Sequence, residues 1–451
     1  MPNEIKNVSA EPTKDFFISM LVKDIELIRA IPDLIDNCID GAIKLRKKEE
    51  YNGLWVKINL DKDKFVINDN CGGFSVDTAI KYAFRFGRPP GMEKTPMSIG
   101  QFGVGMKRAL FKMGGEFQVE SRHNTKGKQE HFLVNVDVDD WKNSPKDWSF
   151  KLKEIKKENS PNGLNYNGTM VSVTKLHGFV SESFDSEYFT TKLARELMSA
   201  YTIQMNKGLQ LFLNDVPLHS DSLKLLSSFQ IKPGYNKIRY KSKDSENVEV
   251  ELYAGISERE PKNAGWYVFC NGRMVLESDK SEYTGWGEEG EDTLPQYHNN
   301  YARFRGYAFF TSKDASLLPW NTTKTGIDSD SSIYKAVKLE IKKMTSSVLS
   351  FLKNLENERA NFEQTNWNPL QKGVENAQPK NIAELRLDKA LFSAPKPSSP
   401  PRPKIKIANI TYSKPKKIID QLKEKYNLNS NKALGEYTFD YFYKLEFEDE
   451  E

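Results

Sequence analysis

The N-terminal part of the chain carries apolar residues at helical spacing. Across residues 16–48 isoleucines recur near this spacing, at Ile25, Ile28, Ile31, Ile35 and Ile39. This pattern predicts a helical region with one apolar face. Pro32 interrupts it, because proline has no N–H to donate and disfavours a helical conformation in the preceding residue. We therefore expect a kink or a new helix start at Pro32.

Alternating apolar and polar positions predict strands farther along the chain. The expected strands are Leu54–Leu60, Lys64–Asn68, Phe117–Ser121, His131–Val138, Phe150–Ile155 and Thr169–Lys175. Helices that come first and strands that follow indicate an α+β fold, in which helices cover one face of a sheet. The first domain is expected to span residues 1–180.

A second α/β domain is expected over residues 181–358. Its predicted elements are a helix at Phe189–Thr202, strands at Leu209–Leu213, Val248–Ile256 and Trp266–Cys270, and a helix at Ile333–Asn357. Residues 359–404 include a run rich in proline and serine, APKPSSPPRP, which predicts a flexible linker. Residues 405–451 are expected to form a short interaction segment with a helix near Lys416–Tyr426. The aromatic residues that follow suit an edge strand or a helix face.

Composition places the chain among soluble globular proteins. Hydrophobic residues make up 38% and charged residues 28% of its 451 residues, and no apolar run reaches the roughly 20 residues of a membrane span. The first residues lack the apolar centre of a signal peptide. The three cysteines show no metal-type spacing, and we expect a cytoplasmic protein. The net charge of +4 neither demands nor excludes DNA.

Three short segments carry candidate chemistry: Asp33-Leu-Ile-Asp-Asn37, Asp69-Asn-Cys-Gly-Gly73 and Gly100-Gln-Phe-Gly103-Val-Gly105-Met-Lys107. Asp33 and Asn37 are four residues apart, so a helix places both side chains on one face. Taken alone, they also suit a solvated acidic face, and the second segment alone suits an ordinary turn. The glycines of the third segment allow backbone amides to converge on phosphate oxygens ahead of a helix.

In this order and spacing the three segments resemble the nucleotide site of the GHKL ATPases, which include gyrase-type topoisomerases, heat-shock chaperones of ninety kilodaltons, MutL proteins and MORC proteins. The resemblance covers residues 16–180 well and 185–355 loosely. It implies a Bergerat-type α/β sandwich that binds ATP and Mg²⁺. A transducer-like α/β domain and a linker-tethered C-terminal segment would follow.

The resemblance also implies residue roles. Asp33 would be the catalytic acid that activates water, Asn37 the Mg²⁺ ligand, and Asp69 the acceptor for the adenine amine, supported by Gly73 and Thr169. The phosphates would lie against Gly100, Gln101, Phe102, Gly103, Val104, Gly105 and Lys107. The lid over the nucleotide would be Phe84–Ser98. Two departures stand out. The family usually has glutamate where this chain has the shorter Asp33, and Cys71 occupies the place of a glycine.

The second domain adds one candidate. Gly265–Val275, with its Asn-Gly-Arg turn, resembles a segment of the transducer domain in MutL and topoisomerase relatives. In those relatives a lysine from this domain reaches the γ-phosphate. Lys324, in the sequence LPWNTTKTGID, is the corresponding candidate here, although it is also one lysine among dozens.

Three functions stay open from the sequence. The first is an ATPase that closes on ATP, forming a homodimer, and opens after slow hydrolysis. Its nearest relatives would be bacterial MORC-like and chaperone-like ATPases, some of which act in anti-phage defence. The second is a nucleotide-gated binding module with little turnover, and the third is a MutL-like DNA clamp. A protein partner would dock on the C-terminal segment. A histidine kinase is not expected, because none of the five histidines lies on a helix ahead of the motifs.

Overall fold

The computed structural model describes residues 11–46, 50–87, 96–100, 103–155, 160, 163–241, 247–290, 293–362, 366–398 and 408–447. The chain divides into two compact units, Met1–Ser398 and Ser399–Glu451. The first unit contains two large sheets and their helices, so the predicted α+β class is confirmed. In the described part of the chain, no helix is long and apolar enough to cross a membrane.

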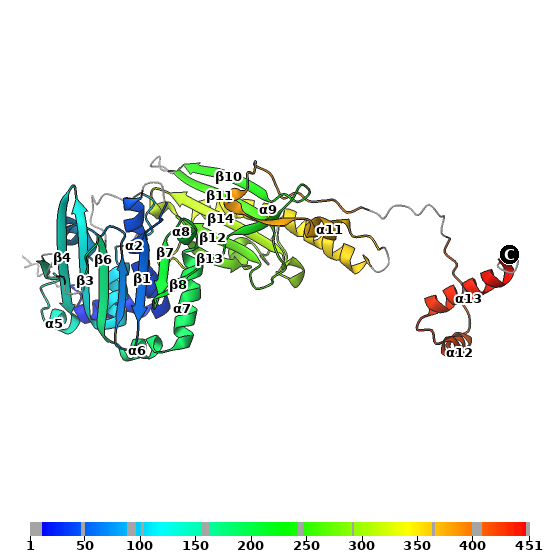
Figure 1. Cartoon of the computed structure of the whole chain (residues 1–451), viewed down its shortest axis with the longest axis horizontal. Helices are drawn as coiled ribbons and strands as arrows, with labels where there is room; N and C mark the ends of the chain where they lie inside the picture. The colour runs from blue at the N-terminus through cyan, green and yellow to red at the C-terminus, as the bar shows by residue number, and fades with distance from the viewer. Residues whose placement is uncertain are drawn as a thin grey trace, which may run out of the picture. The chain divides into compact units, whose positions relative to one another are not determined.

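The first sheet has eight strands in the order β5-β4-β3-β6-β2-β1-β7-β8 (Figure 1). They are β1 (Trp55–Leu60), β2 (Phe65–Asp69), β3 (Gly114–Thr125), β4 (Lys128–Asp137), β5 (Leu152–Glu154), β6 (Gly168–Leu176), β7 (Gln210–Leu213) and β8 (Val216–Leu218). Neighbouring strands run antiparallel except β1 and β7, which are parallel. Antiparallel pairing of β2 with β6 places Asp69 opposite Thr169.

The helices of this region are α1 (Lys14–Lys23), α2 (Leu27–Leu45), α3 (Val76–Thr78), the π-helix η1 (Ala79–Ala83), α4 (Gly105–Met113), α5 (Val138–Lys142), α6 (Gly178–Phe184), α7 (Glu187–Ala200) and α8 (Thr202–Asn206). The new helix start, one of the two alternatives expected at Pro32, is wrong. Helix α2 begins at Leu27 and continues through Pro32, because the apolar face of α2 is buried along the core on both sides of the proline. This face also packs beside α4.

The second sheet has the order β10-β11-β14-β12-β13. Its strands are β10 (Gly234–Lys241), β11 (Asn247–Ile256), β12 (Gly265–Cys270), β13 (Arg273–Asp279) and β14 (Phe304–Ser312). The long helix α9 (Ser332–Ala360) packs against β11 and β14, and the indole of Trp266 donates a hydrogen bond of 2.9 Å to Thr345 on α9. Short 3-10 turns are η3 (Glu282–Thr284), η4 (Asn299–Tyr301), η5 (Ala315–Leu317) and η6 (Ile382–Glu384).

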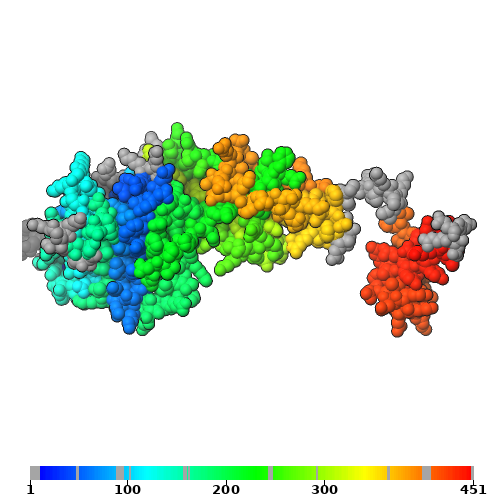
Figure 2. Space-filling view, viewed as in Figure 1, coloured from blue at the N-terminus to red at the C-terminus, as the bar shows by residue number. Residues whose placement is uncertain are grey.

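Two segments differ from the expected domain limits. The strand expected at Leu209–Leu213 in the second domain is β7, which pairs with β1 and therefore extends the first sheet. Residues inside the expected linker form α11 (Pro369–Glu375) and β15 (Gln378–Asn381), which pairs with β9 (Lys224–Ser227). Both sheets belong to the first unit. In the space-filling view, their residues, coloured from blue to yellow, form one continuous surface (Figure 2).

The second unit contains two helices, α12 (Lys416–Tyr426) and α13 (Asn431–Phe447). The aromatic residues near the C-terminus therefore lie on a helix, which resolves the alternative between strand and helix left open by their spacing. Most of these aromatic side chains are exposed, while Leu434 is buried.

Candidate nucleotide site

One pocket collects the predicted site residues. It is lined by Asp33, Asn37, Asp69, Gly73, Gly100, Gly103, Val104, Gly105, Lys107, Thr169 and Lys324, among others. Gln101 and Phe102, also predicted, lie outside the described residues, as does part of the expected lid. The structure thus brings together every predicted site residue that it describes, from both halves of the first unit.

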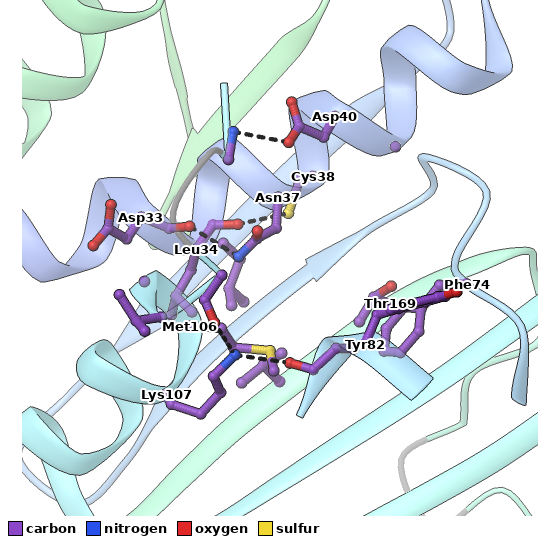
Figure 3. Close-up of a pocket in the computed structure, with 18 of the residues that line it drawn as sticks. Asp33, Leu34, Asn37, Cys38, Asp40, Phe74, Tyr82, Met106, Lys107 and Thr169 are labelled. Atoms are coloured by element: carbon purple, nitrogen blue, oxygen red, sulfur yellow. Dashed lines mark hydrogen bonds between the residues drawn. The ribbon is translucent and has the colours of Figure 1, made fainter. Parts of the chain in front are cut away.

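Helix α2 forms one wall of the pocket (Figure 3). The Asn37 amide nitrogen donates a hydrogen bond of 2.9 Å to the Asp33 carbonyl oxygen. This bond orients the side chain and leaves its amide oxygen with no donor among the described residues. A neutral oxygen of this kind suits Mg²⁺, which takes oxygen ligands and keeps several waters and phosphate oxygens. The donor set therefore fits Mg²⁺ at Asn37.

Asp40, one turn beyond Asn37, has a structural role that the sequence reasoning missed. Its carboxylate accepts hydrogen bonds from the backbone N–H groups of Ile99 (2.7 Å) and Gly100 (2.9 Å). Burial raises the Asp40 pKa to about 6, against the opposing effect of these two bonds. Asp40 therefore holds the start of the glycine-rich segment against α2. Its place three residues after Asn37, on the same helix face, is the signal that could have indicated it.

Asp33 lies between two cations. One carboxylate oxygen accepts a hydrogen bond of 2.6 Å from Arg108, and the other lies 3.4 Å from the Lys324 ammonium. The Asp33 side chain is buried, and in Figure 3 it points away from Lys107. Sequence reasoning missed Arg108, although it directly follows Lys107 on α4. In this state both oxygens of the candidate catalytic carboxylate are occupied.

Lys324 forms its shortest ion pair with Asp36, at 2.6 Å. Asp36 also accepts a hydrogen bond of 2.8 Å from the Tyr201 hydroxyl and lies 3.5 Å from Nε of Arg273. Burial alone would lower the Lys324 pKa, but the charges of Asp36 and Asp33 raise it above its ordinary value. The ammonium is therefore charged, and it joins the second half of the unit to α2.

The loop around Lys324 is under backbone strain. Lys324 has φ of 55°, in the left-handed region that a residue with a side chain rarely adopts. Asn321 maintains this turn, since its backbone carbonyl accepts the Lys324 N–H at 3.0 Å and its side-chain oxygen accepts the Thr325 N–H at 3.0 Å. Strain of this kind tends to persist where the surrounding structure requires it, often at functional sites.

Asp69 forms the second part of the pocket. Its carboxylate accepts a hydrogen bond of 2.7 Å from the Cys71 N–H, and a backbone hydrogen bond from Thr169 also reaches it. Burial is the main cause that raises the Asp69 pKa to about 6. At neutral pH Asp69 is therefore a buried acceptor, suited to an exocyclic amine. Figure 3 shows Thr169 and Phe74 apart from the labelled residues of α2.

The turn after Asp69 explains why Cys71 is tolerated. Gly72 and Gly73 adopt positive φ (94° and 61°), whereas Cys71 does not. A Cβ at Gly73 would lie 2.3 Å from the Arg122 carbonyl oxygen, a distance that requires the backbone to move. The two glycines are thus at the positions that need them, and the cysteine stands where a side chain fits.

Lys107 and the glycine-rich segment form the third part of the pocket. Gly103 has φ of 67°, and α4 begins at Gly105, whose added Cβ would lie 3.1 Å from the Asp33 carboxyl carbon. The Lys107 ammonium donates to the carbonyl oxygens of Ala83 and Gly103. Burial lowers its pKa to about 8. Amides at the start of a helix, together with a lysine held nearby, form a surface that favours phosphate.

Comparison with known families agrees with this geometry. Residues 25–161 match the family model described as histidine kinase-, DNA gyrase B- and HSP90-like ATPase. No curated protein matches the chain. This segment is a GHKL-type ATPase domain, a class whose fold binds ATP, and the resemblance inferred from the three segments is confirmed at the level of the superfamily. The match ends well before the second sheet and Lys324.

Proposed function

We propose that this protein is an ATP-driven conformational switch of the GHKL type, which binds ATP with Mg²⁺ and hydrolyses it slowly to ADP and phosphate. The observation that carries the proposal is the position of Lys324. This residue lies 291 positions after Asp33 in the chain, yet its ammonium enters the nucleotide pocket and contacts both Asp33 and Asp36. A cation at this place can respond to the phosphates and transmit their presence to the second sheet.

The proposed roles are those that the resemblance of the motifs implies, and the contacts support them. Asp69 and Thr169 would select adenine, with Gly73 allowing close approach, and the segment from Gly100 to Gly105 would surround the phosphates with Lys107. Mg²⁺, held by Asn37, would neutralise phosphate charge. Asp33 would orient water and accept its proton, a role that requires a carboxylate oxygen within about 2.6–3.2 Å of that water.

Closure would depend on an exchange of partners by Lys324. In this structure its ammonium forms ion pairs with Asp36 and Asp33. A γ-phosphate offers more negative charge than either carboxylate, so Lys324 would move to it and free one oxygen of Asp33. The same movement would shift the loop at Asn321 and with it the second sheet.

The wider setting of the switch is also a proposal. ATP-bound closure would bring two copies together as a homodimer, and a protein partner would dock on residues 405–451. A kinship with bacterial MORC-like proteins and a role in anti-phage defence, in the cytoplasm, rest on the resemblance of the motifs alone.

One observation favours a second candidate, a nucleotide-gated binding module with little turnover. Asp33 is one methylene shorter than the family's glutamate, and both of its carboxylate oxygens are in ion pairs with Arg108 and Lys324. Both oxygens of a carboxylate held in this way are occupied, so neither is free to contact an attacking water. If it stays held when ATP binds, binding and closure would occur without hydrolysis.

Magnesium-dependent phosphate release and ATP binding, measured on the same protein, separate the two candidates. For the switch we expect turnover that is lost in Asp33→Asn while ATP binding is retained, and lost together with Mg²⁺-dependent binding in Asn37→Ala. ATP binding by the parent without turnover would support the binding module. A parent that binds no ATP would contradict both.

A further inference from the structure

A second pocket lies at the other end of β14 from the nucleotide site. The strand begins directly after Arg303 and ends at Ser312, which accepts a hydrogen bond from Asn271 on the nucleotide side. Asn271 also donates to the carbonyl oxygen of Ser98, close to the glycine-rich segment. Phe304 and Ser312, the two ends of this nine-residue strand, lie roughly 26 Å apart at about 3.3 Å per residue step. The second pocket is therefore distinct from the nucleotide site.

Three arginines face this pocket, which we name the arginine pocket: Arg259 after β11, Arg303 before β14 and Arg359 near the end of α9. Antiparallel pairing of β11 with β14 brings the first two together, because Ile256 lies opposite Phe304. The other lining residues are Asn300, Leu352, Leu355, Glu356, Phe362, Asn368 and Gln371.

The charge in the arginine pocket is poorly balanced. In the described part of the chain, no carboxylate lies within 4 Å of Arg259 or Arg303, whose guanidinium groups contact the backbone carbonyls of Asn299 (3.3 Å) and Ser257 (3.2 Å). Arg359 has a long contact of 3.9 Å with Glu356. Burial lowers the Arg303 pKa, and the neighbouring cations Arg259 and Arg359 lower it further.

The nearby carboxylates do not neutralise this cluster. Glu358 on α9 accepts the backbone N–H groups of Leu370 (3.0 Å) and Gln371 (2.9 Å), and so holds the start of α11. Glu258 and Glu375 act on Arg303 only at longer range. Among the carboxylates here, Glu356 alone lines the pocket, against three guanidinium groups.

The shape and remaining walls indicate the kind of anion. The cavity has a volume of about 360 Å³, within the roughly 300–1,000 Å³ typical of small-molecule sites. Leu352, Leu355 and the partly exposed ring of Phe362 form an apolar wall, while Asn368 and Gln371 offer amide groups. Guanidinium groups bind phosphate oxygens in pairs, and an aromatic ring beside amides suits a planar polar group.

We propose that the arginine pocket binds a small phosphorylated molecule of nucleotide type, with Arg259, Arg303 and Arg359 on its phosphates and the apolar wall against its base. An extended nucleic-acid strand would instead require basic residues along a surface, and these three converge on one cavity. The site lies on the strand that also contacts the nucleotide side, so its occupant could influence the switch.

The test uses the full chain with one equivalent per chain of an unhydrolysable ATP analogue and Mg²⁺, so that the first site is filled and little free analogue remains to compete for the arginine pocket. Cytidine diphosphate and inorganic phosphate are then titrated by calorimetry. We expect one cytidine diphosphate to bind per chain, and Arg303→Gln and Arg359→Gln each to weaken its affinity by about tenfold or more, as expected for the loss of a charged hydrogen bond. Arg359 is largely exposed, so its variant should fold normally.

Arg386→Gln is the matched control, because Arg386 is exposed and does not line the pocket. It should leave the affinity for cytidine diphosphate unchanged. Absence of binding by either probe at millimolar concentration would overturn the proposal, as would affinities that both pocket variants leave intact. Arginine-dependent binding of a single-stranded oligonucleotide, without binding of cytidine diphosphate, would also overturn it in favour of a nucleic-acid site. If the ATP analogue itself does not bind, the function proposed above fails, while the arginine dependence of cytidine diphosphate binding still decides this one.

Discussion

Replacing Lys324 by methionine should test the buried ion pairs that join the second sheet to α2. The substitution keeps the length and apolar stem of the side chain and removes its charge. Lys324 lies 2.6 Å from Asp36 and 3.4 Å from Asp33, and all three side chains are buried. At an effective dielectric constant of about 20, these separations correspond to about 6 and about 5 kcal/mol of Coulomb attraction.

The net effect is smaller, because burying the ammonium costs much of this attraction. Removing one partner of a buried ion pair typically lowers the free energy of unfolding by about 3–5 kcal/mol. After Lys324→Met, Asp33 keeps Arg108, and Asp36 keeps the Tyr201 hydroxyl and the neighbouring Arg273. We therefore expect Lys324→Met to lower the free energy of unfolding by about 3 kcal/mol, the lower limit of this range.

The assay is urea unfolding of the full chain followed by tryptophan fluorescence, for Lys324→Met, Asp36→Asn and the double variant. Asp36→Asn removes the charge that Lys324→Met deprives of its shortest ion pair. The double variant should therefore lose about 2 kcal/mol less stability than the sum of the two single losses. Lys335→Met, whose ion pair with Asp330 is at the surface, should change the stability by less than about 0.5 kcal/mol. Single losses that add within about 0.5 kcal/mol would show that the pair does not form in solution and would refute this reasoning.

Three further results are expected. Gly73→Ala should lower the free energy of unfolding by at least about 2 kcal/mol and weaken ATP binding, since its Cβ would meet the Arg122 carbonyl oxygen at 2.3 Å with φ of 61°. Gly72→Ala, with φ of 94° but no atom nearer than 3.7 Å, should cost only about 1 kcal/mol, and equal losses in the two variants would contradict the steric argument. The pH dependence of adenosine affinity should follow Asp69. Because burial raises its pKa to about 6, the carboxylate becomes protonated below that pH and loses its acceptor role. The affinity should then fall about tenfold per pH unit below 6 in the parent and stay flat in Asp69→Asn; a flat profile in the parent would argue against adenine contact. Lys107→Met should weaken ATP binding at least about tenfold with little change in adenosine binding, which equilibrium dialysis with both ligands can measure, and equal effects on both ligands would exclude a phosphate role.

Much of the first domain was predictable because its signals are local. The isoleucines of α2 recur at the helical period, and their burial in the core follows from that spacing. The strands from β1 to β6 alternate apolar and polar residues, and the structure confirms all of them. The three motif segments were identifiable because helix geometry, glycine conformations and short loops depend on residues close together in the chain.

The misplaced features depend on distant partners. The residues of the strand Leu209–Leu213 do not indicate whether it joins the first or the second sheet. Only its parallel pairing with β1 shows that it belongs to the first sheet. Pro32 lies within α2 because burial on both sides maintains the helix despite the lost hydrogen bond. Residues of the expected linker are part of the first unit, because β15 pairs with β9 and the ring of Phe392 packs against Phe351. The proline-rich composition of this segment did not indicate these contacts.

The candidate site shows the same division. By itself the sequence determined the helix face of Asp33 and Asn37, the turn at Asp69 and Gly73, and the glycine-rich segment before α4. Each of these features depends only on residues that are close together in the chain. The resemblance made Lys324 a candidate, but one lysine among many, and only the tertiary structure decided that it enters this pocket. The tertiary structure alone decided that Arg108, Asp36, Tyr201 and Arg273 complete its charge cluster. The physical reason is that a buried charge needs partners of opposite charge or hydrogen-bonding groups within a few ångströms. These partners come from elements that are distant in the chain, and the spacing of residues in the sequence does not indicate which elements come into contact.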